Sequence, residues 1–589
     1  MKDFLKMTLA SCLGSMIVFG ICTFLVISLI VGSIATIVSS ADDSTTTTIV
    51  KPNSVLQLDL TKSIYERTPS ELNSYLESNM VIGADMVLKA IHMAKTDDRI
   101  SGIYLKTSEM YNGGWAITEE IRNALIDFKQ SGKFIYSYSE VYGQKAYYLS
   151  TTADSVFINP SGMLDFKGIA AETIFIKDML DKLNVDVELI RPRNNAFKSA
   201  GEMYTMNHMS EANKTQIRSY ISNIWQHVCT DIAIARNISV DKLNSIANNL
   251  SAYLPTDAVK NGLIDKTAFE HDVLSSIAYT LGIADGDIDD INFIRTKKYA
   301  ESATDSQSKN KIAIIYAQGD VLHGKGSDIN VYSSTITKAI DDAANNSNVK
   351  AIVLRINSPG GAVIASEIMT NAVMRAKEKK PIVVSMSDVA ASAGYEISCN
   401  ATKIVAMPTT ITGSIGVFGI YPQVGRMLKN KLGITTDTIL TNRNAAALSI
   451  NRPLSAESHN MLVRNVEDFY KTFCQRVAKG RNLSVEYVDS IARGRVWTGI
   501  QAKELGLVDE LGGIDVALRI AAQEAGITNY SIVAYPKQKD AVTELMEMLN
   551  EEALKAHLQN QSIAKYYKQM EQISNMEPLQ ARLPYFIEF

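Results

Sequence analysis

The amino-acid sequence repeats itself, and this internal duplication limits the possible folds more than any other feature. Gly113-Gly114 aligns with Gly360-Gly361 at an offset of 247 residues, and Gly262-Leu-Ile-Asp265 aligns with Gly506-Leu-Val-Asp509 at an offset of 244. An offset that drifts so little over most of each unit indicates two diverged copies in tandem. The length agrees with this interpretation, because 589 residues exceed what one hydrophobic core usually supports.

Each copy is predicted to be an α/β domain. In the second copy, β-rich runs bounded by Pro, Gly or charged residues predict strands at 311–316, 351–356 and 381–385. Residues 365–376 lie between the last two strands and show helical spacing of their apolar side chains. Strand, helix and strand in succession imply a largely parallel sheet. We therefore expect two α/β domains, at 51–300 and 311–538, joined by a polar linker at 301–310.

The N-terminal segment is predicted to anchor the protein in a membrane. No charged residue occurs between Lys6 and Ala41, and about 20 apolar residues are enough to cross a bilayer. A cleaved signal peptide is the alternative, but its apolar region usually has only about 7–15 residues. We expect a transmembrane helix at 7–38 and a linker at 39–50. Lys2 and Lys6 favour a cytoplasmic N-terminus, so both copies would face the periplasm from a bacterial inner membrane.

The C-terminal part, residues 539–589, is predicted to be a helical extension. Its pattern from Leu545 to Tyr567 is typical of a helix. The apolar end at 583–589 would pack against the core or against a neighbouring subunit, and the sequence does not decide between these two.

Composition excludes several classes of protein. The net charge of −4 provides no basic excess to neutralise phosphates, so no nucleic-acid partner is expected. The five cysteines and seven histidines show no C-x-x-C, no H-E-x-x-H and no other metal-ligand spacing. We expect neither a metal ion nor a cofactor.

Three Gly- and Ser-rich stretches follow predicted strands of the second copy. They are 357–361, 388–394 and 412–419. Each one alone is adequately explained as a turn. Together they indicate a ligand site, because sites in open α/β folds lie at the carboxyl ends of strands.

Ser392 is the candidate nucleophile among these residues. It lies between small residues, before a stretch that can start a helix, where unpaired N–H groups can stabilise an oxyanion. The backbone of Gly360-Gly361 offers further donors. His323 and His459 are the only histidines of the second copy, and neither is near these stretches. A desolvated lysine can act as the base instead, but spacing alone does not select one.

Four motifs carry a resemblance to a known family. They are Ser358-Pro-Gly-Gly361, Ala390-Ala-Ser-Ala-Gly-Tyr395, Thr412-Gly-Ser-Ile-Gly-Val-Phe-Gly419 and Ala196-Phe-Lys-Ser-Ala-Gly201. With the duplication and the N-terminal anchor, the chain resembles signal peptide peptidase A in its long, duplicated form. That family implies a Clp protease/crotonase-like fold in both copies. It also implies a membrane-bound serine endopeptidase of the protease IV type.

The resemblance assigns roles to individual residues. The family nucleophile falls on Ser392, and the general base falls on Lys198 of the first copy. Gly361 and Ala393 would supply the oxyanion N–H groups, and Ser414 would orient the lysine. Ala393 stands where the family more often has glycine, a change that keeps the backbone N–H. The implied substrates are cleaved signal peptides and unfolded segments, and the implied assembly is a homotetramer.

The duplication supports a site that is shared between the copies. At the offset of 247, Ser392 corresponds to Lys145, so the first copy lacks the nucleophile. The second-copy stretch corresponding to Lys198 is about 442–447, which contains no lysine. Each copy therefore lacks the group that the other keeps.

Two other functions fit parts of the sequence. A catalytically dead membrane scaffold would keep the fold but predicts erosion at Ser392, Lys198 or Ser414, and these residues are present. A crotonase-like acyl-CoA enzyme would share the fold, yet it requires neither a membrane anchor nor an outward-facing location.

Overall fold

The computed structural model describes residues 49–69, 82–283, 286–303, 308–326, 329–538 and 579–582. Both copies belong to one compact unit, made of Lys51–Thr68, Val81–Lys537 and Lys568–Phe589. The expected membrane anchor at 7–38 lies outside the described residues. None of the helices in the described part of the chain combines the length and apolar character needed to cross a bilayer.

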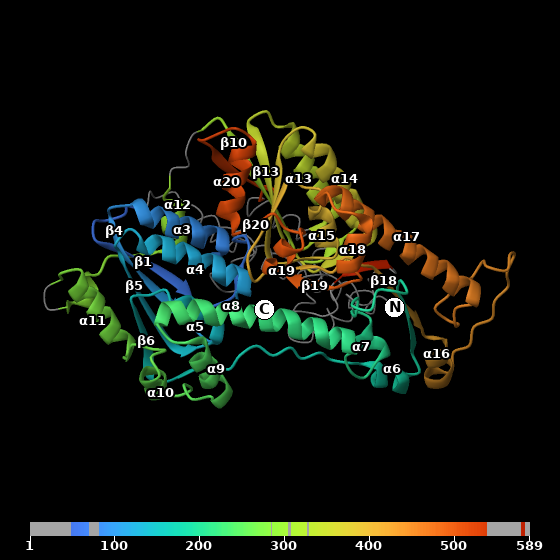
Figure 1. Ribbon diagram of the computed structural model, residues 1–589, viewed down its shortest axis with the longest axis horizontal. Coiled ribbons are helices and arrows are strands. Elements are labelled where there is room, and N and C mark those ends of the chain that lie inside the picture. The colour runs from blue at the N-terminus through green and yellow to red at the C-terminus, as the bar shows by residue number, and fades with distance from the viewer. Residues whose placement is uncertain are drawn as a thin grey trace, which may run out of the picture. The chain divides into compact units, whose positions relative to one another are not determined.

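The first copy is built on a parallel sheet in the order β8-β6-β5-β4-β1-β9 (Figure 1). Its strands are β1 (Ser54–Leu60), β4 (Ile100–Thr107), β5 (Phe134–Tyr142), β6 (Ser155–Leu164), β8 (Lys266–Thr267) and β9 (Phe293–Arg295). Its helices are α3 (Ala84–Thr96), α4 (Trp115–Lys129), α5 (Gln144–Ser150), α6 (Lys177–Leu183), α7 (Glu202–Thr205), α8 (Glu211–Arg236), α9 (Val240–Asn249), α10 (Pro255–Lys260), α11 (Glu270–Thr280), η3 (Ile288–Asp290) and α12 (Thr296–Glu301). A small pair, β2 (Ile64–Tyr65) and β3 (Ile82–Gly83), lies outside this sheet.

The second copy repeats this arrangement in the order β19-β17-β15-β13-β10-β21, with β16 and β20 branching from β15. Its strands are β10 (Lys311–Gln318), β13 (Val349–Ser358), β15 (Ile382–Ala391), β16 (Lys403–Ala406), β17 (Ile411–Gly413), β19 (Val496–Thr498), β20 (Glu510–Leu511) and β21 (Ser531–Tyr535). Its helices are α13 (Ser333–Asn345), α14 (Val363–Lys377), α15 (Ala393–Ser398), α16 (Gly425–Leu432), α17 (Ala456–Arg481), α18 (Val485–Ile491), α19 (Gly499–Glu504) and α20 (Ile514–Glu524). The three strands and the helix predicted from sequence are confirmed within β10, β13, β15 and α14.

The two longest helices show how closely the copies match. Both α8 and α17 have 26 residues. Ser210 and Ser455 cap their N-termini by accepting a backbone N–H, and left-handed Asn237 and Asn482 end them. The same local chemistry therefore sets the same helix length in each copy.

The central strands of the second copy are buried on both faces. All ten residues of β15 are buried, as is most of β13. Apolar clusters cover the two faces, one with α13 and α14 and the other with α20. This explains why the sequence shows continuous apolar runs here instead of alternation.

A third sheet joins the two copies in the order β12-β11-β14-β22-β18-β7. Its members are β11 (Val321–Leu322), β12 (Val331–Tyr332), β14 (Gly360–Ala362), β18 (Phe418–Gln423), β7 (Asp186–Ile190) and β22 (Leu579–Arg582). First-copy β7 runs antiparallel to second-copy β18. The extension at 539–589 was expected to be helical, but its described part, β22, is a strand, because it pairs with sheet edges on both sides.

A buried charge cluster also links the copies. Arg355 on β13 contacts Glu66 at 2.8 Å and Glu120 of α4 at 2.6 Å, and all three side chains are almost fully buried. The Arg355 side chain also donates to Ser385 and Ser387. Removing one partner would leave a buried charge without compensation, so this cluster couples the stability of the two copies.

Candidate active site

Ser392 lies at the turn from β15 into α15. It is the N-cap residue of α15, with φ 58° and ψ −116°, and its side chain is fully buried. Its backbone N–H donates to the Gly413 carbonyl at 2.8 Å. A positive φ is uncommon for residues other than glycine and persists only where the surroundings enforce it. The strand-to-helix turn expected from sequence is confirmed.

Lys198 of the first copy lies beside this serine. Its Nζ is 2.7 Å from Ser392 Oγ and 3.0 Å from both the carbonyl oxygen and the Oγ of Ser414. Burial lowers the pKa of the Lys198 amine well below its ordinary value of 10.5. The structure thus brings together three of the residues predicted from sequence, and it surrounds the amine with oxygen atoms.

The loop that carries Lys198 is held by both copies. The Phe197 N–H donates to the Arg493 carbonyl at 3.2 Å, and Gln216 of α8 donates to the Phe197 carbonyl at 3.0 Å. Gly494, with φ 80°, lies so close that a Cβ would come within 2.5 Å of Lys198. Sequence reasoning missed Gly494; a glycine between two arginines, just before β19, was the available signal.

Ser414 has its own strained backbone, with φ 50°. Its N–H donates to the Arg495 carbonyl at 2.7 Å. Because this loop also contributes the carbonyl and hydroxyl that contact Lys198, it determines where the amine points.

Gly361 and Ala393 come from two elements next to the serine. Ala393 is the first residue of α15, where backbone N–H groups have no partner inside the helix. Gly361 packs against β11 so tightly that a Cβ would come within 2.1 Å of the Val321 carbonyl oxygen. Close backbone approach therefore requires glycine at this position.

A peptide strand already lies beside these residues. The backbone of β22 pairs antiparallel with β14 on one side, Gly361 opposite Ala581, and with β18 on the other, Phe418 opposite Gln580. We call the space between Gly360–Ala362 and Phe418–Gly419 the peptide slot. An extended chain in this slot forms main-chain hydrogen bonds along both edges.

Comparisons with known proteins decide the family. The family model described as "Peptidase family S49" matches the chain twice, at residues 127–283 and 374–528. Over 477 residues the chain is 34% identical to "Protease 4" of Salmonella typhi, which covers 79% of this chain and 75% of that protein. The chain belongs to peptidase family S49.

Two further proteins are similar to parts of this chain. This S49 peptidase is 30% identical over 487 residues to "Serine protease SPPA, chloroplastic" of Arabidopsis thaliana, covering 81% of this chain and 70% of that protein. A solved ClpP1 variant from Listeria monocytogenes is 17% identical, covers 34% of this chain and 92% of that one, and gives a TM-score of 0.24. With two S49 domains, the protein is a serine peptidase of the protease IV type in the long, duplicated form.

The alignment register of the two copies differs by one residue from the sequence prediction. Tyr147 and Tyr395 make matching hydrogen bonds, to the carbonyls of Leu263 and Leu507, so they occupy equivalent positions. Ser392, three residues before Tyr395, therefore corresponds to Gln144 instead of Lys145. Local sequence identity placed the alignment of the two copies one residue out of register here, because both copies have small and aromatic residues in succession. The first copy still lacks a nucleophile at this position.

Asp388 connects strand β15 of this S49 peptidase to the first copy. Its carboxylate accepts the N–H groups of Ala116 and Ile117 at the N-terminus of α4, at 2.9 and 3.1 Å. Burial, together with the charge of Glu66, raises the pKa of Asp388 to about 6. Lys145 faces the same region, and burial lowers its pKa to about 8. Sequence analysis assigned Asp388 only to a turn.

Residues that could bind a metal ion gather at one place in the described part of the chain, in Glu119, His227 and Asp231. His227 Nε2 is 2.9 Å from Glu119 Oε1, and the Tyr148 hydroxyl donates to Asp231. The guanidinium of Arg122 lies 3.8 Å from Asp231 and supplies positive charge. These hydrogen bonds and ion pairs connect the side chains to one another, so we assign the cluster a structural role.

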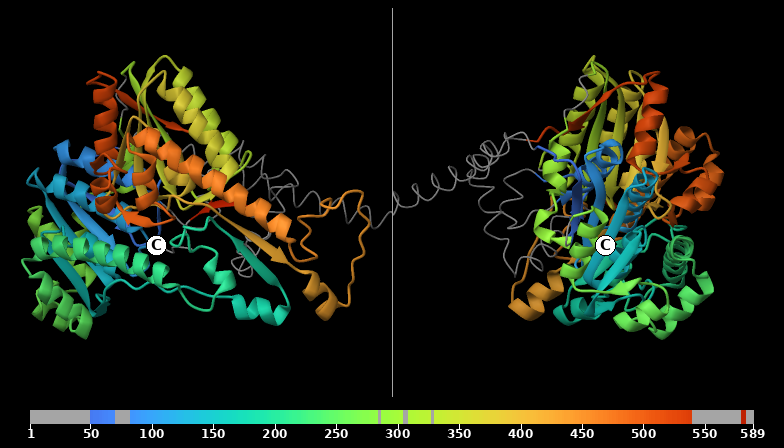
Figure 2. Two further views of the ribbon diagram at one scale, coloured as in Figure 1. Left: turned by 45° about the vertical axis from the view of Figure 1, so that its right-hand side comes forward. Right: turned by 90° about the vertical axis from the view of Figure 1, so that its left-hand side faces the viewer.

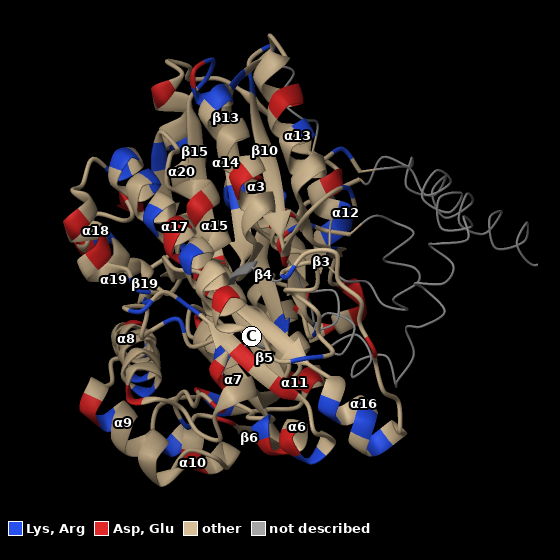
Figure 3. Ribbon diagram, turned by 90° about the vertical axis from the view of Figure 1, so that its right-hand side faces the viewer, with Lys and Arg blue, Asp and Glu red and all other residues tan. Residues whose placement is uncertain are grey.

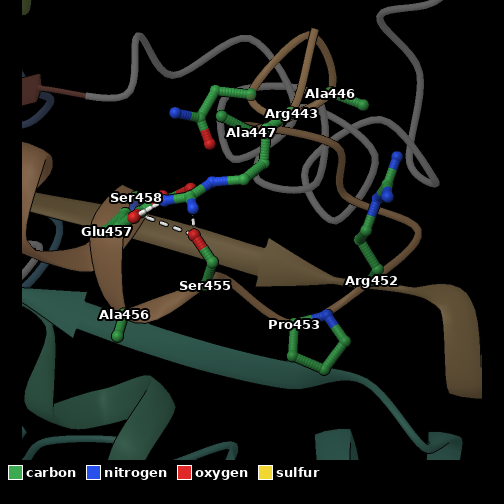
Figure 4. A pocket seen from close by; sticks show the side chains of 10 residues that line it. Arg443, Ala446, Ala447, Arg452, Pro453, Ser455, Ala456, Glu457 and Ser458 are labelled. Atoms are coloured by element: carbon green, nitrogen blue, oxygen red, sulfur yellow. Dashed lines mark hydrogen bonds and ion pairs between the residues drawn. The ribbon is translucent and has the colours of Figure 1, made fainter. Parts of the chain in front are cut away.

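One cavity among the described residues has a volume of about 430 Å³ (Figure 4). It is lined by the loop before α17 and by the first turn of that helix, within 443–458. Arg443 and Glu457 form an ion pair across it. Ser392 and Lys198 do not line this cavity.

Proposed function

We propose that this S49 peptidase cleaves peptide bonds with Ser392 as the nucleophile and neutral Lys198 as the general base. The observation that carries the proposal is the distance of 2.7 Å between Lys198 Nζ and Ser392 Oγ in a fully buried site. Burial favours the uncharged amine, which accepts a proton from the hydroxyl.

The reaction follows from these contacts. Ser392 Oγ attacks the carbonyl carbon of the substrate while Lys198 takes the hydroxyl proton, and the oxyanion develops near the N–H groups of Gly361 and Ala393. The lysine ammonium then protonates the leaving amine, which departs and leaves an acyl-enzyme. A water molecule, deprotonated by Lys198, attacks the ester and releases the carboxylate product. Ser414 keeps the amine oriented through two contacts of 3.0 Å.

The peptide slot supports an extended peptide as the substrate. Main-chain pairing on both edges accepts many sequences, as the degradation of cleaved signal peptides and unfolded segments requires. As the resemblance implies, the proposal includes a membrane anchor at residues 7–38 in a bacterial inner membrane, with both copies in the periplasm. It also implies Clp protease/crotonase-like domains and a homotetramer.

The test is hydrolysis of a quenched signal-peptide substrate by the detergent-solubilised full chain. Ser392→Ala and Lys198→Met should each lower kcat/KM by at least about 1,000-fold, the range found for members of catalytic triads. Lys133→Met is the matched control, because Lys133 is also a first-copy lysine whose amine donates to main-chain carbonyls, those of Ala94 and Asp97, and it has no contact with Ser392. Activity retained in Lys198→Met would refute the proposed base, and an inert wild type would favour a scaffold.

A further inference from the structure

The strand that joins the two copies has an unpaired counterpart in the second copy. Helices α6 and α16 are equivalent: both contain a Met-Leu pair, Met179-Leu180 and Met427-Leu428. Both end at a left-handed residue, Asn184 and Gly433. In the first copy the chain then enters β7, so the equivalent second-copy segment is 435–439.

In the first copy this segment is fully paired. Strand β7 runs antiparallel to β18, with Ile190 opposite Gly419 and Glu188 opposite Tyr421. The Ile190 side chain is 2% exposed. Strand β7 therefore contributes both main-chain hydrogen bonds and apolar burial to the contact between the copies.

In the second copy the equivalent segment has no strand partner among the described residues. All of 435–439 is exposed, and Ile439, which corresponds to Ile190, is 98% exposed. Figure 2 shows the stretch between α16 and α17 as an extended loop at the edge of the molecule. An apolar residue at a position that is buried in the sister copy indicates a missing partner.

The first copy offers a matching acceptor segment that pairs with no strand among the described residues. Gly168-Ile169 corresponds to Gly419-Ile420 at the start of β18. Residues 170–175 follow in irregular conformation and belong to none of the described sheets, and Ile174 is 74% exposed. The described part of the chain thus carries one donor segment and one acceptor segment that lie in no sheet, with Gly168 held only by the side chain of Gln144.

We propose that residues 435–439 of one chain pair antiparallel with residues 168–175 of a second copy of this chain, as β7 pairs with β18 within one chain. The internal pairing sets the register, with Ile439 opposite Gly168 and Asp437 opposite Ala170. The donor segment contains Asp437 and the acceptor contains Glu172, two residues apart in this register, and helix α16 before the donor carries Lys429 and Lys431 (Figure 3).

The contact is head-to-tail, because donor and acceptor are different surfaces of the same chain. Such heterologous contacts build closed rings or open filaments. Arg443 precedes Ser455 by as many residues as Lys198 precedes Ser210. The junction between chains would therefore bring Arg443 toward Gln144, where the junction within a chain brings Lys198 to Ser392. The interface between chains would therefore have the same arrangement of segments as the active site, with Arg443 and Gln144 in place of Lys198 and Ser392.

This inference deepens the proposed assembly by naming its surface, and it does not depend on proteolytic activity. The direct test is a mixture of two chains, one with Asp437→Cys and one with Ala170→Cys, both with Cys12 and Cys22 replaced by serine, oxidised in detergent. The mixture should give a covalent dimer of 64.7 kDa chains, and each variant alone should not. The native Cys229, Cys399 and Cys474 are buried and do not interfere. An intact oligomer without this cross-link would overturn the proposed pairing.

A second measurement uses the mass of the assembly in solution. Ile439→Asp places a charge in the proposed contact and should shift most of the protein from the oligomer to the single chain. The matched control is Ile234→Asp, at a residue of α8 that is 78% exposed, which should leave the oligomer unchanged. An oligomer that survives Ile439→Asp overturns this surface but not the proposed assembly, whereas a monomeric wild type overturns both.

Discussion

Ser392 and Gln144 occupy the same turn in two copies of one fold, but their surroundings differ. Ser392 has a positive φ, full burial and an amine at 2.7 Å. Gln144 instead uses its side-chain amide to hold the next loop, accepting the N–H groups of Lys167 and Gly168. The fold needs only a turn into a helix here, and the proposed function needs the serine. In that proposal the first copy supplies the lysine and the second the nucleophile.

The largest expected effect concerns the buried contact between the two copies. Arg355→Met leaves Glu66 and Glu120 buried without their partner, so the free energy of unfolding should fall by about 3–5 kcal/mol. Chemical denaturation of the detergent-solubilised chain measures this change. Arg375→Met removes an exposed ion pair with Asp341 and should cost less than about 1 kcal/mol. Equal losses in both variants would show that the buried cluster does not couple the copies.

A substitution beside Lys198 tests the comparison at the candidate active site. Gly494→Ala introduces a Cβ that would lie 2.5 Å from Lys198, so kcat/KM should fall by about 100-fold through displacement of the amine. Gly282→Ala is the matched control, because Gly282 has a similar φ of 74° with open space around it. Activity similar to wild type in Gly494→Ala would mean that the loop tolerates movement without losing the amine.

Asp388, which lies in the second copy, is expected to make the stability of the protein depend on pH. Its pKa is raised by burial to about 6 from an ordinary 3.8, so the folded state holds this proton more tightly than the unfolded state. Its contribution to stability is therefore greatest below about pH 4 and declines as pH rises to about 6, by on the order of 2 kcal/mol. The difference in unfolding free energy between wild type and Asp388→Asn, measured from pH 4 to 7, should show this slope. A constant difference would refute it.

The smallest effect is expected in the peptide slot. Removing residues 579–589 takes β22 out of the slot and should raise kcat/KM for a short peptide several-fold, because substrate no longer competes with the chain's own strand. Removing only 583–589 keeps the strand and serves as the control. Equal activity in both truncated proteins would show that β22 does not compete with substrate.

Patterns within the sequence predicted most of the fold. The duplication, the parallel sheets and the strands around β13 and β15 follow from local periodicity and from self-similarity, both of which one chain displays. The turn at Ser392 was also predictable, because small residues there join a strand to a helix. Lys198 became a candidate only through the family resemblance, and its role stays a prediction.

Contacts between distant segments were not predictable in the same way. Gly494 matters because of its distance from Lys198, and Asp388 because of its contact with the N-terminus of α4, and neither contact leaves a local pattern. The tail showed helical spacing over 545–567, while its strand β22 depends on two edges supplied by other parts of the fold. Pairing across the molecule thus overrides local preference at the site.

The central claim is that Lys198 acts as a neutral base for Ser392. The direct measurement is the rate at which a fluorophosphonate probe acylates Ser392 in the full chain as a function of pH. The rate should fall only as acid protonates the amine, with a midpoint well below 10.5, and Lys198→Met should abolish the labelling. A midpoint near 10.5, or equal labelling in Lys198→Met, would contradict the account.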